Sequence, residues 1–137
     1  MSIKKILLLG VFIELLFGGP VFGLDSVQIG FETEVDQAVH IGHTQGVIST
    51  AVGQQYKDFF KAGYEQLMGY CEKGEIDSKI KKNIANILDA MQLLKDKGID
   101  ITRLLNEYTG PVLTEANRRY VKRTGKNQPT LIKYIGG

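Results

Sequence analysis

Two histidines and two acids near the start of the chain have the residue types to bind a metal ion. They are Glu32, Asp36, His40 and His43. On a single helix, all four side chains would point within about one quadrant of the helical wheel. Imidazole and carboxylate groups together suit zinc or another first-row divalent ion. The pattern therefore permits a divalent-metal or small-ligand module centred on His40 and His43, with Asp36 as a third ligand.

The alternative interpretation of this segment is a polar helix flank with two histidines at a packing seam. The spacing of His40 and His43 is not a metalloenzyme signature, and no second group of possible ligands elsewhere in the sequence completes a coordination shell. Polar residues on one helix face are most often solvated. We therefore favour the structural interpretation and keep the metal site as a hypothesis.

The sequence contains no arrangement typical of an active site. Both histidines lie on one segment, Cys71 falls within an apolar stripe, and no serine occupies a Gly-x-Ser-x-Gly turn. Glycine-rich phosphate loops and haem-attachment motifs are also absent from the sequence. We predict that the protein is not an enzyme and that it needs no cofactor apart from the hypothetical divalent metal.

Basic residues are concentrated after Pro111, where Glu115 is the only acid. Four of them fall in two adjacent helical turns: Arg118, Arg119, Lys122 and Arg123. This spacing predicts that at least two of them point together and bind an acidic protein surface or an anionic envelope polymer. The alternative is a set of favourable cations at a helix C-terminus. On the sequence alone, reversing Arg119 and Lys122 to Glu should leave thermal stability nearly unchanged.

The whole-chain charge does not favour a nucleic-acid partner. The formal net charge is only +2, and the basic segment carries no nucleic-acid-binding motif. We therefore predict a protein partner for the basic residues.

The first 23 residues have the organisation of a secretory signal peptide. Lys4 and Lys5 precede the short apolar run 6–13, and small residues end the segment at Gly23. Glu14 interrupts the apolar stretch, which is shorter than the roughly 20 residues of a membrane-spanning helix. We predict cleavage after Gly23 and a periplasmic or secreted product with no stable membrane span. The alternative is an uncleaved anchor.

The rest of the chain, 24–137, is expected to form one all-α domain, a compact bundle of four or five helices. Its clearest helix covers 54–71, with an apolar stripe at three- and four-residue steps. Gly74 should end that helix with a left-handed cap, and Asp77 or Ser78 should cap the next one. The inward face of that next helix is Ile80, Ile84, Ile87, Leu88, Met91 and Leu94.

Three further expectations concern the flanking segments. The loosely helical segment before 53 places Gly42 and Gly46 on one side, which is typical of close helix packing. Pro111 suits the first position of another helix. The segment 130–135 alternates weakly and should form a short extended tail or an edge strand. Cys71 is the only cysteine, so it either lies buried on the apolar stripe, which we favour, or pairs with a second chain in a homodimer.

The order of these features resembles the periplasmic immunity proteins that act against type VI secretion amidase toxins. The likeness lies in the glycine pattern of 42–51, the cysteine-led turn 71–76, the apolar helix 80–94 and the last segment 101–116. Members of that family usually carry further cysteines, whereas Cys71 stands alone here. The resemblance implies inhibition by binding, without catalysis. The leading prediction is thus an exported, non-enzymatic helical protein that binds another protein.

Overall fold

The computed structural model describes residues 25–136, which form helices and no strand. The elements are α2 (Ser26–Thr44), α3 (Thr50–Lys73), α4 (Asp77–Asp96), α5 (Thr102–Glu107), the π-helix η1 (Tyr108–Val112), α6 (Leu113–Thr124) and α7 (Pro129–Tyr134). Because α5, η1 and α6 follow one another without a break, residues 25–136 make five helical runs. The expected all-α bundle is confirmed. None of these helices is long and apolar enough to cross a membrane.

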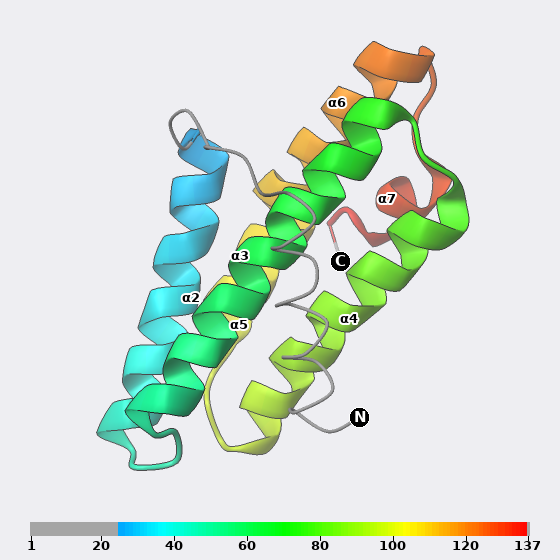
Figure 1. The fold of residues 1–137 in the computed structure, drawn as a ribbon. Coiled ribbons are helices and arrows are strands. Elements are labelled where there is room, and N and C mark those ends of the chain that lie inside the picture. The colour runs from blue at the N-terminus through cyan, green and yellow to red at the C-terminus, as the bar shows by residue number, and fades with distance from the viewer. Residues whose placement is uncertain (1–24, 137) are drawn as a thin grey trace.

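The long helix α3 occupies the centre of the bundle and packs against α2, α4 and α6 (Figure 1). Its predicted apolar stripe is buried throughout: Tyr56, Phe59, Phe60, Gly63, Tyr64, Leu67, Met68 and Cys71. The inward face of α4 meets it as expected, except that Leu88 is only half-buried. Since Cys71 is fully buried, the prediction that this thiol packs in the core is confirmed. Burial raises the pKa of its thiol to about 12, so the thiol stays protonated.

The turn between α2 and α3 separates the two glycines that the sequence places on one face. Gly42 is buried near the end of α2, where a β-carbon would meet the Ile48 side chain. Gly46 instead lies in the turn with φ 73°, a left-handed conformation that glycine adopts without strain. The expectation that both glycines serve helix packing was wrong for Gly46, which lets the chain reverse so that α3 can begin at Thr50.

The next turn confirms one expected cap and contradicts another. Gly74 has φ 64° and caps α3, as predicted. Asp77 does not cap α4, which has Ile76 at its N-cap and no side-chain hydrogen bond there. Its carboxylate instead accepts hydrogen bonds from Gln128 Nε2 at 2.5 Å and Thr130 Oγ1 at 2.6 Å. Asp77 therefore bonds to residues some fifty positions away in the sequence and does not cap its own helix.

The C-terminal segment also differs from the sequence-based expectation. Residues 129–134 form the helix α7 and not an extended tail. Gln128 Oε1 accepts a hydrogen bond from the Leu131 backbone N–H at 2.8 Å and so caps this helix. Thr130 and Leu131 are buried, which explains the apolar character of the segment.

Pro111 does not begin a helix. It lies inside η1, between α5 and α6. A proline has no N–H to donate to the preceding turn and clashes with a regular α-helical backbone there. The wider π-helical turn accommodates it without ending the helical run.

Candidate functional site

The helix α6 carries the basic residues that the sequence singles out, and the structure gives them unequal roles. Arg119 is the centre of an ion-pair cluster that joins three helices. Its Nη2, Nη1 and Nε lie 2.8 Å from Asp25 Oδ2, Glu72 Oε1 and Glu115 Oε2, respectively. Its side chain is only 19% exposed. We call these four residues the Arg119 cluster; it joins the start of α2, the end of α3 and the middle of α6.

The carboxylate of Asp25 has further partners, which make this part of the cluster a structural joint. Its Oδ1 accepts a 2.7 Å hydrogen bond from the Gln28 backbone N–H and thereby caps α2. The Tyr64 hydroxyl donates to the same oxygen at 3.1 Å. Burial and the neighbouring Asp25 charge raise the pKa of Tyr64, so its hydroxyl remains a donor. Arg119 therefore holds the first turn of α2 against α3.

Glu115 holds both neighbouring arginines of α6. Arg118 donates two hydrogen bonds to the Glu115 carboxylate, from Nε at 2.8 Å and from Nη2 at 2.7 Å. Arg119 Nε donates a third hydrogen bond to the same oxygen that Arg118 Nη2 contacts. The hydrogen bond from Arg118 is the largest of the effects that lower the pKa of Glu115 to about 2, despite its partial burial. The carboxylate is thus ionised at all ordinary pH values and fixes the direction of two guanidinium groups.

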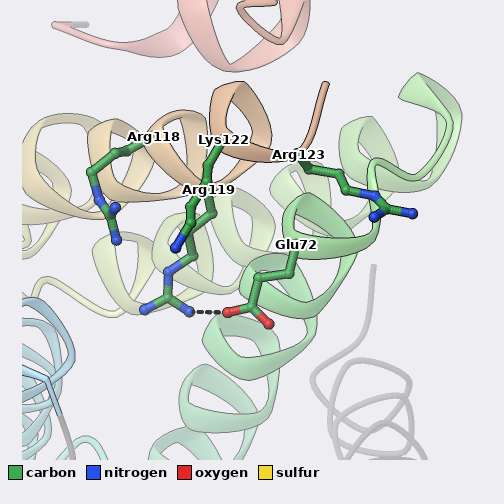
Figure 2. Close-up of a pocket in the computed structure, with 5 residues that line it drawn as sticks. All are labelled: Glu72, Arg118, Arg119, Lys122 and Arg123. Atoms are coloured by element: carbon green, nitrogen blue, oxygen red, sulfur yellow. Dashed lines mark hydrogen bonds and ion pairs between the residues drawn. The ribbon is translucent and has the colours of Figure 1, made fainter. Parts of the chain in front are cut away.

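These side chains line a groove between the end of α3 and the last turns of α6. The groove has a volume of about 510 Å³ and is lined by Glu72, Arg118, Arg119, Lys122 and Arg123. Figure 2 shows Arg118, Arg119 and Lys122 pointing to the same side, with Glu72 reaching toward Arg119 and Arg123 pointing away. We call this the basic groove. Lys122 and Arg123 are exposed, and within residues 25–136 neither forms an ion pair.

The ion pairs of Arg119 argue against the expectation that this residue can be reversed without loss of stability. An arginine bonded to three carboxylates cannot become Glu without placing four acids together. The acids concerned, Asp25 and Glu72, are far from Arg119 in the sequence, and no local pattern indicates the contact. The excess of acids between 24 and 71, which includes Asp25, was a signal that some of them meet cations from elsewhere in the chain.

The predicted metal ligands on α2 are divided between two environments. Asp36 and His40 are exposed and line a shallow hollow of about 410 Å³ with Thr33, Gln37 and Ile41. Asp36 also lies 3.8 Å from Lys57 Nζ. His43 is half-buried at the seam with α3, where its Nδ1 lies 2.9 Å from the Ile48 carbonyl oxygen. Its ring packs over Gly53, where a β-carbon would approach His43 Cε1 to 2.7 Å.

No three of the residues that could bind a metal come together anywhere within residues 25–136. His43 is held in the turn by packing, so Asp36 and His40 share the hollow without it. Glu32 lies half-buried one turn earlier, and burial is the main cause that raises the pKa of its carboxyl. This arrangement corresponds to the alternative in which the polar residues of α2 flank a packing seam.

Comparisons of this chain with protein-family models, curated proteins and solved structures found no match. The resemblance to periplasmic immunity proteins therefore stays a prediction. The predicted signal peptide, 1–23, lies outside the described residues.

Proposed function

We propose that this chain is an exported, non-enzymatic helical protein that binds an acidic surface of a protein partner, as an immunity or inhibitor protein of an envelope toxin would. The observation that supports the binding role is the basic groove. It presents Lys122 and Arg123 without an intramolecular counter-ion among the described residues, beside guanidinium groups that are already oriented. Cations that are exposed and unpaired attract an acidic partner and accelerate its association.

The fixed geometry of the groove supports recognition of carboxylates. Glu115 holds the Arg118 guanidinium through two hydrogen bonds, so this side chain loses little conformational freedom when a partner binds. A planar guanidinium with free N–H groups recognises carboxylate oxygens more specifically than a point charge does. A pre-oriented basic groove is suited to docking an acidic segment.

Charge reversal tests the proposal directly. The variant Lys122→Glu, Arg123→Glu should recover less partner than the wild type when each is used as bait in the native cell-envelope fraction, most clearly at low salt. The matched control is Lys95→Glu, Lys97→Glu, which makes the same change in charge at the C-terminal end of α4, far from the basic groove (Figure 1). This control should recover the partner as the wild type does. Equal recovery by all three proteins would contradict the proposal.

Export is tested separately. N-terminal sequencing of the protein from the envelope or the medium should begin at Leu24, because small residues precede the proposed cut after Gly23. A membrane-associated product that retains Met1 would instead support the uncleaved anchor.

A further inference from the structure

Glu72 is the one acid in the lining of the basic groove. Its Oε1 lies 2.8 Å from Arg119 Nη1, and its side chain is 58% exposed (Figure 2). It therefore occupies one edge of a guanidinium group within the surface that we propose as the docking site. An acid at this position opposes the binding of an acidic partner unless it can leave.

The three carboxylates around Arg119 are held with different strength. Glu115, 16% exposed, also bonds to Arg118, and Asp25, 39% exposed, also caps α2 and bonds to Tyr64. Glu72 is the most exposed of the three. Within residues 25–136, it has no hydrogen bond or ion pair besides that to Arg119. It is the member of the cluster that another carboxylate can replace at the lowest cost.

The position of Glu72 on its helix does not account for an acid there. It lies in the last turn of α3, which ends at Lys73. The C-terminal end of a helix carries partial negative charge, so an acid in the last turn is locally unfavourable. Helix stability alone gives no reason for Glu72, and within residues 25–136 its carboxylate bonds only to Arg119 in the basic groove.

We infer that an acidic segment of the partner supplies a carboxylate that binds Arg119 and displaces Glu72. In the unbound protein, Glu72 occupies the position of that carboxylate. The inference rests on the proposed function. Because one carboxylate replaces another, Arg119 keeps three acidic partners throughout. Its bonds to Asp25 and Glu115 still join α2 to α6, and Tyr64 still links Asp25 to α3. The displaced Glu72 side chain enters water, and Arg118 and Lys122 face the rest of the acidic segment. Glu72 thereby sets the affinity of the site as an internal competitor.

The test measures binding of a fluorescein-labelled octaglutamate peptide to the full-length protein by fluorescence anisotropy at low salt. Glu72→Gln removes the competing charge and retains an oxygen for Arg119, and its thermal melting should remain close to that of the wild type. This variant should bind the peptide about three- to tenfold more tightly, as expected for one charge repulsion in a partly screened site. The matched control Glu75→Gln makes the same charge change at an acid that pairs with Lys79, and its affinity should change less than about twofold.

The variants separate failure of this inference from failure of the proposed function. Lys122→Glu, Arg123→Glu should lose most of the peptide affinity; if it binds octaglutamate as the wild type does, the basic groove itself is not the docking site. If that variant loses binding but Glu72→Gln binds no more tightly than Glu75→Gln, only the competitor role of Glu72 is overturned. Vesicles containing phosphatidylglycerol serve as the second probe. Tighter binding of Glu72→Gln to vesicles but not to the peptide would overturn the assignment of a protein segment as the occupant.

Discussion

The polar cluster on α2 and the basic cluster on α6 were both predicted from helical spacing, and tertiary contacts changed both. On α2, His43 packs into the seam with α3 and leaves Asp36 and His40 as an exposed pair. On α6, Arg119 is drawn into a three-acid cluster, yet the neighbouring cations still line one groove. The difference is that α6 keeps three further cations beside Arg119, whereas α2 keeps only two possible ligands without His43. A site survives the loss of one member when enough of the others remain.

The largest expected effect distinguishes the two arginines of α6. Arg119→Met should lower the free energy of unfolding by about 2–4 kcal/mol, because it removes a partly buried cation that three acids share. Arg118→Met, at a side chain 62% exposed, should cost less than about 1 kcal/mol. Urea denaturation of both variants measures the difference. Similar losses would show that Arg119 is an ordinary surface residue, as the sequence suggested.

The next prediction tests whether His43 on α2 is a packing residue. Gly53→Ala places a methyl group 2.7 Å from both His43 Cε1 and Val39 Cγ1, and should lower the free energy of unfolding by about 1–3 kcal/mol. Adding His43→Ala should recover part of this loss, since it removes one of the two obstructing side chains. The control Gly110→Ala introduces a methyl group with no atom within 4 Å and should change stability little. If His43→Ala gives no recovery, His43 does not form the seam.

Each cluster contains a glutamate, and the surroundings shift the pKa of the two carboxyl groups in opposite directions. Their contributions to stability should therefore depend on pH in opposite ways. The pKa of Glu115 is lowered from 4.5 to about 2, so its ionised form stabilises the fold above pH 4.5 and this stabilisation disappears as the pH falls toward 2. In Glu115→Gln, the free energy of unfolding should therefore be lower than that of the wild type at pH 6 and should fall less steeply in acid. Chemical denaturation at stepwise pH values measures both. Parallel curves for the two proteins would contradict the assignment.

Glu32 on α2 should behave in the opposite sense. Burial is the main cause of its raised pKa, so its contribution to stability is present at low pH and is lost as the pH rises through the folded-state value. Glu32→Gln removes an unfavourable charge and should raise the free energy of unfolding at pH 7 by a few tenths to about 1 kcal/mol. The same pH series checks this. A variant less stable than the wild type at pH 7 would indicate that ionised Glu32 is well satisfied.

The smallest effect is expected for metal binding on α2. Calorimetric titration with zinc should show no tight site, because His43 is held in the seam and two remaining ligands make a weak site. The metal hypothesis predicts the opposite: zinc binding that His40→Ala and His43→Ala each abolish without changing the helical circular dichroism. Such binding would mean that His43 leaves the Ile48 carbonyl to coordinate the ion.

The helices themselves were predictable because their signals are local. The apolar stripe of 56–71 and the inward face of 80–94 recur with the helical period, so burial of these faces followed from spacing alone. Gly74 was also predictable as a cap, since a left-handed residue is needed where α3 ends. The all-α class and the central place of α3 were therefore fixed by sequence pattern.

The remaining features depend on residues that are distant in the chain. Asp77 is a good capping residue in isolation, but Gln128 and Thr130, at the start of α7, donate hydrogen bonds to its carboxylate. Arg119 fits an exposed helix end by sequence, but Asp25 and Glu72 meet it only because α3 packs against both α2 and α6. Hydrogen bonds are short-ranged and directional, and water and salt weaken exposed ion pairs beyond close contact. A polar side chain therefore takes its final partner from whichever helix packing brings within reach. Apolar periodicity therefore determined the helices and the core, and packing determined which polar groups remain free to bind.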